Sequence, residues 1–235
     1  GLGDVYKRQS NICTAQALLA TMAGFYAVYH GPEGIRTIAE RIHSIAVFLE
    51  ESINRLGYKQ VNAQYFDTLR FALPDTISAQ QIRTIALSKE VNLRYFKNGD
   101  VGMSIDETTD ITAVNVLLSI FAIAAGRDWE KASDVPMASS ISAEMKRQST
   151  YLTHEVFNKY HTETEMMRYI KRLDRKDISL AHSMISLGSC TMKLNAAAEM
   201  LPLSRPEFMG MHPLVPEDQA EGYRELIHNL SEELK

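Results

Sequence analysis

Apolar residues recur at intervals of three and four over two consecutive stretches near the start of the chain, the spacing of one face of a helix. The first stretch begins at Ile12 and carries Ala15, Leu18, Leu19, Met22, Phe25, Tyr26 and Tyr29. Gly31 and Pro32 interrupt it, and proline suits the first turn of a new helix because its missing N–H would have no partner there. The second helix is predicted to end at Gly57, a left-handed cap, after a face of Ile35, Ile38, Ile42, Ile45, Leu49, Ile53 and Leu56.

The following stretch has the pattern of strands and helices. Residues 67–73 alternate like a strand, and Ser78 with Gln81 resembles a capping box that opens a short helix. Residues 91–96 and 101–105 flank an Asn-Gly pair, which predicts a hairpin. A further helix is predicted from its cap Asp110 to Gly126, with a face of Ile111, Val114, Leu117, Leu118, Phe121 and Ala125. Residues 10–126 are therefore predicted to form an α/β layer of helices on a small sheet.

Beyond residue 126 the periodicity fades, and polar residues around Pro136 indicate a connector over residues 127–183. Within it, Thr162 and Glu165 form a second candidate capping box before a helix bearing Met166, Tyr169, Ile170 and Leu173. The last region, residues 184–235, ends in a helix with Tyr223, Leu226, Ile227 and Leu230. Residues 1–9 form a separate N-terminal segment.

Composition narrows the class of protein. The chain has 235 residues, 45% of them hydrophobic and 23% charged, which is typical of a soluble globular protein. No apolar run approaches the roughly 18 residues of a membrane helix, and residues 1–9 lack the core of a signal peptide, so the cytosol is expected. The net charge of −4 is interspersed, which disfavours nucleic acid. Cys13 and Cys190 lie too far apart in sequence for a disulfide framework or a local metal motif.

The densest candidate for chemistry is the segment 186–195 (SLGSCTMKLN), where Gly188 frees the backbone. Its donors could approach an anionic ligand, and they are Ser189, Cys190, Thr191, Lys193 and Asn195. An ordinary polar turn before the alanine-rich segment at Ala196 explains the same residues, so both interpretations stay open.

A second polar group gathers His154, Glu155, Asn158, His161 and Glu163. Such residues can perform acid–base chemistry, but polar residues in front of a helix explain them better, and metal-ligand spacing is missing. The acidic run 106–110 is attributed to the positive end of the helix that follows it.

Several of these segments together resemble the P-proteins of the glycine cleavage system. The matching stretches are 10–20 (SNICTAQALLA), 106–109 (DETT), 153–158 (THEVFN), 163–165 (ETE) and 187–196 (LGSCTMKLNA), in family order. Residues 1–9 depart from the Arg-Glu-Lys-Ala-Thr run usual before Ser10, and Ser186 stands where proline is expected.

The resemblance implies a fold-type-I pyridoxal-phosphate-dependent transferase architecture in two related halves. Residues 10–126 would end the first half with its small α/β domain, and residues 184–235 would open the second half after the connector. The lysine that binds the cofactor is expected downstream of Lys235, so Lys193, otherwise a candidate for a Schiff base, is not assigned that role. The chain alone is expected to be an inactive part of the enzyme.

The resemblance also implies the reaction and the partners. Glycine would bind through pyridoxal phosphate and release carbon dioxide, and its aminomethyl group would pass to the lipoyl arm of H-protein, an oxidoreductase activity. The rest of the P-protein, in the same chain or a second subunit, would complete a dimeric assembly, bacterial and cytoplasmic or, in a eukaryote, mitochondrial. Four residues are expected to line the site, Ser189, Cys190, Thr191 and Lys193, with Asn11, Cys13 and Thr14 approaching from the first half.

Three other hypotheses remain at this stage. The chain could be a non-catalytic partner or regulatory module of the same complex, which would lack a downstream lysine segment. It could belong to another fold-type-I class such as the aminotransferases, which the segment 187–196 disfavours. The cysteines Cys13 and Cys190 could form a redox switch, given their implied place near the site.

Overall fold

The computed structural model describes residues 14–176, 182, 198 and 201–235. It divides the chain into two units, Gly1–Lys176 and Asp177–Lys235, and each is described by itself. The first unit contains α2 (Thr14–Arg55), β1 (Lys59–Gln60), β2 (Thr68–Ala72), α3 (Ala79–Ser88), β3 (Arg94–Tyr95), β4 (Val101–Ser104), α4 (Ile111–Ala125) and α5 (Glu163–Asp174), with short 3-10 turns η2 (Ala143–Met145) and η3 (Glu155–Asn158). The second contains η5 (Leu201–Ser204), α7 (Pro206–Met209), η6 (Glu217–Gln219) and α8 (Glu221–Glu233).

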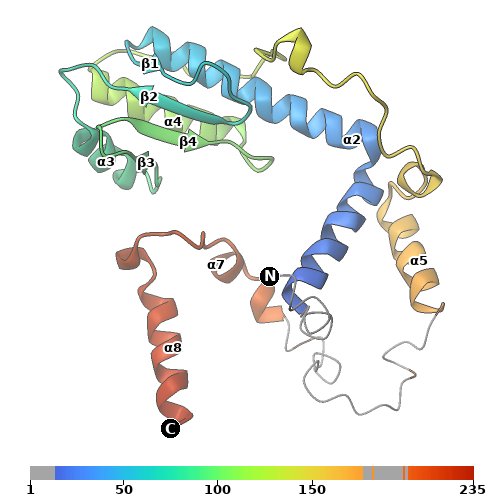
Figure 1. Cartoon of the computed structure of the whole chain (residues 1–235). Coiled ribbons are helices and arrows are strands. Elements are labelled where there is room, and N and C mark those ends of the chain that lie inside the picture. Colours follow the sequence, from blue (N-terminus) through green and yellow to red (C-terminus); the bar gives the residue numbers. More distant parts are fainter. Residues whose placement is uncertain (1–13, 177–181, 183–197, 199–200) are drawn as a thin grey trace, which may run out of the picture. The chain divides into compact units, whose positions relative to one another are not determined.

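The long helix α2 bends at Gly31, which has φ 63° and ψ −176°, with Pro32 directly after it (Figure 1). The prediction of two helices separated at Gly31-Pro32 is confirmed. Gly57 has φ 101°, so the predicted left-handed end of the second helix is confirmed as well.

Most of the buried residues of α2 lie in its second half, although Val28 of the first half is buried as well. Ile45, Leu49 and Ile53 are no more than 3% exposed, whereas Leu18, Leu19 and Met22 of the first half are between 57% and 65% exposed. Full burial of a side chain of this size stabilises the fold by about 1.5 to 3 kcal/mol, so the second half anchors the helix to the rest of the unit. The first half exposes the apolar side chains of Leu18, Leu19 and Met22.

The sheet has four antiparallel strands in the order β1-β2-β4-β3. Strand β2 lies inside the predicted segment 67–73, and β3 and β4 form the predicted hairpin, with Gly99 at φ 91°. Strand β3 is shorter than predicted because the N–H of Val91 bonds to the carbonyl of Ala86 and ends α3, leaving residues 91–93 outside the ladder. The two-residue β1 is too short to leave a pattern in the sequence.

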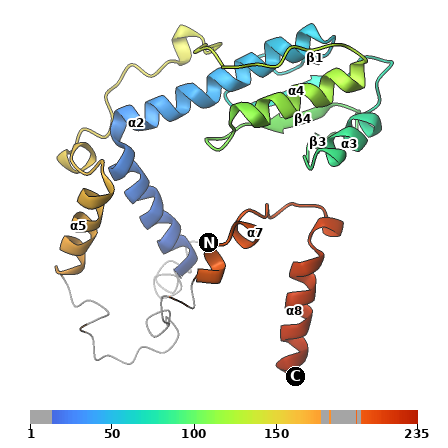
Figure 2. The same cartoon turned by 180° about the vertical axis from the view of Figure 1, so that it is seen from behind.

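The helices α2, α3 and α4 cover one face of the sheet (Figure 2). Leu69 and Phe71 of β2 and Val101 of β4 are fully buried in this layer. Phe121 of α4 lies at its centre, edge-on to Tyr58 at 5.0 Å and 5.7 Å from Phe71 between ring centroids. The predicted α/β arrangement, helices on one small sheet, is confirmed.

The predicted helix caps form through side-chain bonds to free backbone N–H groups. The Ser78 hydroxyl accepts from the N–H of Gln81 at 3.1 Å, and the Asp110 carboxylate accepts from that of Ala113 at 2.8 Å. The Gln81 side chain donates to the carbonyl of Ala124 at 3.2 Å, which ties α3 to α4. Gly126 closes α4 in the left-handed conformation, and Thr162 accepts from the N–H of Glu165 at 3.3 Å to cap α5.

The irregular chain after α4 is attached to the first unit rather than free. Trp129 and Val135 pack against the core, and Asn115 holds Ala132 through two bonds, its amide nitrogen donating to the carbonyl at 2.9 Å and its oxygen accepting from the N–H at 2.8 Å. The first unit therefore extends through the early part of the predicted connector to α5.

In the second unit, the Tyr223 hydroxyl of α8 donates to the carbonyl of Phe208 at 2.6 Å, and their rings meet edge-on at 6.1 Å. The predicted last helix is confirmed. Its apolar face of Leu226, Ile227 and Leu230 is between 56% and 61% exposed.

Candidate functional site

The residues predicted to line a cofactor site fall mostly outside the described part of the chain. These are Asn11, Cys13, Ser189, Cys190, Thr191 and Lys193, with Thr14 as the first residue of α2. Their proximity to one another therefore stays a prediction. The described residues instead reveal how the helix that follows Thr14 is held and what surrounds it.

The bend in α2 is held by residues 151–161, here called the clasp. Pro32 has no N–H and Gly31 departs from helical geometry, so carbonyls of the turn before Pro32 lose their helical donors. His161 Nδ1–H donates to the carbonyl of Tyr29 at 2.7 Å, and the Tyr151 hydroxyl donates to the carbonyl of Pro32 at 2.7 Å. The clasp thus supplies donors to both sides of Gly31.

His154, Glu155 and Asn158 of the clasp make contacts within the clasp itself. His154 Nδ1 accepts from the N–H of Val156 at 3.2 Å, and the Asn158 amide donates to the carbonyls of Leu152 and His154 at 3.2 and 3.1 Å. Glu155 pairs with Lys159, whose hydrogen bond and charge lower the pKa of that carboxyl. The structural interpretation of the group from His154 to His161 is therefore favoured over acid–base chemistry.

An aromatic cluster fixes α5 to the first half of α2. The rings of Tyr160 and Tyr169 stack at 4.3 Å, and the Arg172 guanidinium lies 5.2 and 5.6 Å from their centroids. Arg172 also donates to the Tyr160 hydroxyl at 2.5 Å, while Phe25 of α2 meets Tyr169 edge-on at 6.2 Å. These contacts hold α5 against the first half of α2.

An open cavity of about 1340 Å³ lies between α2 and residues 137–153. Glu33, Arg36 and Glu40 of α2 line one wall, and the other wall includes Lys146 and Arg147. Its apolar lining includes Ile35, Phe66, Met137, Ile141 and Met145. Sequence reasoning missed this cavity because its walls come from distant segments that share no periodic signal.

Residues 138–140 are bonded to α2 beside this cavity by two adjacent side chains. His43 and Ser44 are 2% and 1% exposed. His43 Nδ1 lies 2.8 Å from the carbonyl of Phe66, and its Nε2 accepts from the N–H of Ser140 at 3.0 Å. The Ser44 hydroxyl accepts from the N–H of Ala138 at 3.0 Å. These bonds determine the course of the chain after α4.

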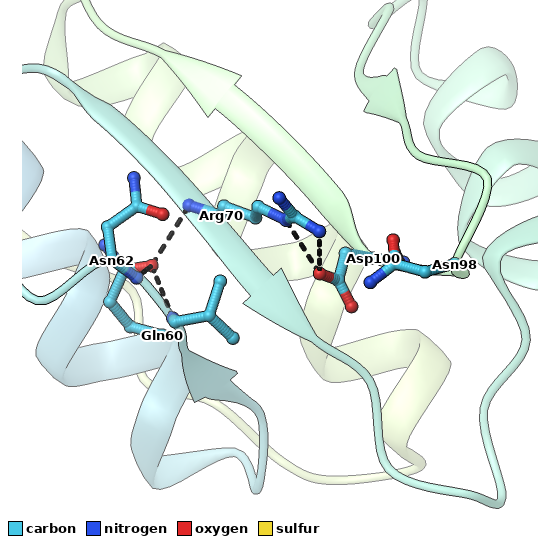
Figure 3. A network of polar contacts seen from close by, with 6 residues as sticks. Gln60, Asn62, Arg70, Asn98 and Asp100 are labelled. Atoms are coloured by element: carbon cyan, nitrogen blue, oxygen red, sulfur yellow. Dashed lines mark hydrogen bonds and ion pairs between the residues drawn. The ribbon is translucent and has the colours of Figure 1, made fainter.

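The opposite face of the sheet carries a polar network (Figure 3). The Arg70 guanidinium donates through two nitrogens, each 2.7 Å from Asp100 Oδ2, and its carbon lies 4.2 Å from the Phe96 ring centroid. Gln60 Oε1 accepts from the backbone N–H of Arg70 at 3.0 Å. Asp100 is 8% exposed, so its carboxylate is buried and depends on Arg70 as its partner. Because Arg70 belongs to β2 and Asp100 to the hairpin, the pair joins these two parts of the sheet. The network therefore has a structural role.

Tyr58, Tyr65 and Asp106 have shifted pKa values that follow from their surroundings. Burial raises the pKa of Tyr58 to about 12 and, together with a hydrogen bond to Glu50, raises the pKa of Tyr65 to about 12. The hydroxyl of Thr108 bonds to Asp106 at 2.7 Å and lowers the pKa of that carboxyl. The acidic run 106–110 thus contains two separate structural features, the Asp106 carboxylate bonded to Thr108 and the helix cap at Asp110.

Residues 14–176, 182, 198 and 201–235 lack the features of a metal site and of a membrane-spanning helix. No group of three or more His, Cys, Asp and Glu side chains there is placed to hold a metal ion. None of the helices in the same residues combines the length and apolar content that a bilayer crossing requires.

The class of protein follows from comparison with known families. Residues 6–121, which include α2, the sheet and most of α4, match the family model described as glycine cleavage system P-protein. The chain belongs to this family. Within it, the chain is 82% identical over 229 residues to a protein of Bacteroides fragilis strain YCH46 named glycine dehydrogenase (decarboxylating).

Other relatives carry the same name. The chain is 80% identical over 229 residues to the protein of Bacteroides thetaiotaomicron and 50% identical over 228 residues to that of Flavobacterium johnsoniae. Each alignment covers 97% of this chain but 24% of the relative. The chain therefore spans about a quarter of the length of the curated relatives it matches.

Proposed function

We propose that this chain is part of a glycine dehydrogenase that binds glycine through pyridoxal phosphate, releases carbon dioxide and passes the aminomethyl group to lipoylated H-protein. The observation that carries the proposal is the 82% identity with a glycine dehydrogenase (decarboxylating) over 97% of this chain. The proposed setting is a dimeric assembly in the bacterial cytoplasm, completed by the remainder of the longer family protein.

The proposed architecture is that of a fold-type-I enzyme. The antiparallel sheet with α2, α3 and α4 on one face is compatible with its small domain, and α2 leads into that domain from residues 10–13. In this proposal residues 10–126 end the first half, residues 127–183 connect the halves, and residues 184–235 open the second half. The clasp then sets the angle at which α2 approaches the small domain.

The cofactor, when bound, would supply the electron sink that stabilises the carbanion left by decarboxylation. We propose that Ser189, Cys190, Thr191 and Lys193 line its site, with Asn11, Cys13 and Thr14 at the opposite wall. The resemblance to the P-proteins implies that the lysine that bonds to the cofactor lies in the part of the family chain downstream of Lys235, so Lys193 is proposed to line the site without forming that bond.

A paired absorbance titration with pyridoxal phosphate tests this proposal. The 235-residue chain and the full-length protein are each measured unmodified and as the Lys193→Ala variant. The expected result is a stable protein-bound chromophore and carbon dioxide release from glycine in the full-length protein, a chromophore that persists in full-length Lys193→Ala, and neither signal in the short chain. A chromophore in the short chain that Lys193→Ala abolishes would show that the cofactor lysine is Lys193.

A second comparison tests the lining residues. Thr191→Val in the full-length protein is expected to weaken cofactor binding at least tenfold, because a buried acceptor or phosphate would lose a donor. Thr84→Val, which removes an exposed hydroxyl of α3, is the matched control and should bind as the unmodified protein does. Equal affinity in all three proteins would remove Thr191 from the proposed site.

A further inference from the structure

We propose that Tyr151 and His161 are positioning residues, which fix the direction of the first half of α2 and thereby the place of its first residue, Thr14. The inference rests on the proposed function, in which residues 11–14 reach the cofactor site from the first half of the enzyme. Both side chains act through backbone carbonyls of α2 at the bend, and neither is assigned a contact with substrate.

The helix itself does not determine the direction of its first half. Gly31 has φ 63° and ψ −176°, and the missing N–H of Pro32 removes a hydrogen bond from the turn before it. The first half is also weakly anchored, because Leu18, Leu19 and Met22 are at least 57% exposed. Contacts from other segments therefore set the angle at the bend.

The two clasp side chains bond to carbonyls on opposite sides of Gly31. The Tyr151 hydroxyl donates to the carbonyl of Pro32 at 2.7 Å. His161 donates from Nδ1 to the carbonyl of Tyr29, also at 2.7 Å. A carbonyl can only accept, so Nδ1 carries a hydrogen, and it keeps that hydrogen when the ring gains a second proton. The bond to Tyr29 therefore does not require a neutral ring.

Packing beside the bend leaves room for its angle to change. An open space of about 400 Å³ lies there, and His30 and Glu33 are among its lining residues. Further along the first half, Phe25 meets Tyr169 of α5 edge-on, with 6.2 Å between ring centroids. Apolar contact is non-directional, whereas a hydrogen bond requires a defined distance and angle. Among the described contacts, the two clasp bonds therefore restrict the angle most strictly.

A small change of angle at Gly31 becomes a large displacement at the start of α2. A helix rises about 1.5 Å per residue, so the part from Thr14 to Gly31 spans about 25 Å. A rotation of about 10° at the bend therefore moves Thr14 by about 4 Å. A displacement of about 1 Å can cost on the order of a hundredfold in rate, so the clasp bonds affect the reaction without touching the site.

The distance across the bend tests the positioning role without cofactor or substrate. Spin-labelled unnatural amino acids at the exposed positions Ala20 and Glu51 place one label on each half of α2 in the full-length protein. Pulsed electron paramagnetic resonance measures the distance between the labels. The double variant Tyr151→Phe/His161→Leu is expected to shift or broaden that distance by about 3 Å or more. Tyr58→Phe, the matched control, loses a tyrosine bond to a carbonyl away from the bend and should leave the distance unchanged.

Glycine decarboxylation by the same full-length proteins provides the functional readout. The double variant is expected to lower kcat at least about tenfold, whereas Tyr58→Phe should keep kcat within about twofold. Urea unfolding of both variants separates this effect from a loss of stability. His161→Asn, whose amide nitrogen can take the place of Nδ1, should keep the distance and most of kcat, in contrast to His161→Leu.

An unchanged distance in the double variant would overturn the positioning role. A shifted distance with full kcat would also overturn it, because the place of Thr14 would then not matter to the reaction. Failure of the unmodified full-length protein to release carbon dioxide from glycine refutes the proposed function instead, and the distance measurement then still decides whether the clasp fixes the direction of α2.

Discussion

His161 donates from Nδ1 to the carbonyl of Tyr29 across 132 residues of sequence, with 2.7 Å between nitrogen and oxygen. The bond lies beside Gly31, where α2 changes direction, and Tyr151 bonds to Pro32 on the other side of that glycine. The bend is thus fixed by tertiary contacts in addition to the local effects of glycine and proline. This arrangement makes the role of Gly31 directly testable.

Gly31→Ala is expected to destabilise the first unit by at least about 2 kcal/mol. Its φ of 63° with ψ of −176° is a region used almost only by glycine, and a Cβ would lie 2.7 Å from the carbonyl oxygen of Phe157. Urea unfolding measures the change. Gly24→Ala is the matched control in the same helix, where a Cβ has open space, and it should stabilise by about 0.5 to 1 kcal/mol.

Arg70→Met should lower the free energy of unfolding by about 2 kcal/mol, because it leaves the buried Asp100 carboxylate without its main partner. Arg70→Lys keeps the charge but not the two-nitrogen contact, so its free energy of unfolding should lie between those of the unmodified protein and Arg70→Met. A double-mutant cycle with Asp100→Asn isolates the pair. A coupling energy near zero would contradict the structural role of the network.

Alkaline pH should destabilise the first unit through its buried tyrosines. The pKa of Tyr58 rises from 10.0 to about 12 on folding, so the unfolded chain ionises first. Stability from this group is complete below pH 10 and is lost as the pH rises toward 12. Unfolding free energies measured from pH 8 to 11 should fall less steeply in Tyr58→Phe, which also loses about 1 kcal/mol at pH 8 with its bond to Phe121. The same slope in both proteins would refute the shift.

Acidic pH should destabilise the first unit through Asp106, whose pKa is lowered on folding. Hydrogen bonds from Thr108 lower the pKa of its carboxyl, so its contribution is present above the ordinary value of 3.8 and is lost as the pH falls through the folded pKa. An NMR titration should place the Asp106 midpoint below 3.8 and nearer to it in Thr108→Ala. Thr112→Ala is the control, and a midpoint unaffected by Thr108→Ala would assign the shift to another cause.

Features whose cause lies within a few residues were predictable from the sequence. Gly31-Pro32, the cap at Asp110 and the Asn-Gly hairpin each contain their own geometric reason, and the structure has them where the sequence places them. The contacts of His161 with Tyr29 and of His43 with Ser140 were not predictable, because their partners lie 132 and 97 residues apart and neither side has a distinctive pattern.

At the candidate site, residue type alone did not predict which polar residues have a functional role. His154, Glu155 and Asn158 have the composition of a catalytic group, yet His154 and Asn158 bond to the backbone of the clasp and Glu155 pairs with Lys159. The cofactor-lining prediction for Ser189, Cys190, Thr191 and Lys193 came from resemblance of a contiguous segment. Residue type alone could not separate these two cases, since the same donors and acceptors serve both purposes.

The clasp also constrains the order of events during protein synthesis. Since the Tyr29 carbonyl obtains its donor from residue 161, α2 can acquire its final angle only after the small sheet and α4 have left the ribosome. Helix α2 is therefore among the last parts of the first unit to reach its final geometry. Until then its first half is free to sample other directions, and a nascent chain paused before residue 151 would display that freedom to chaperones.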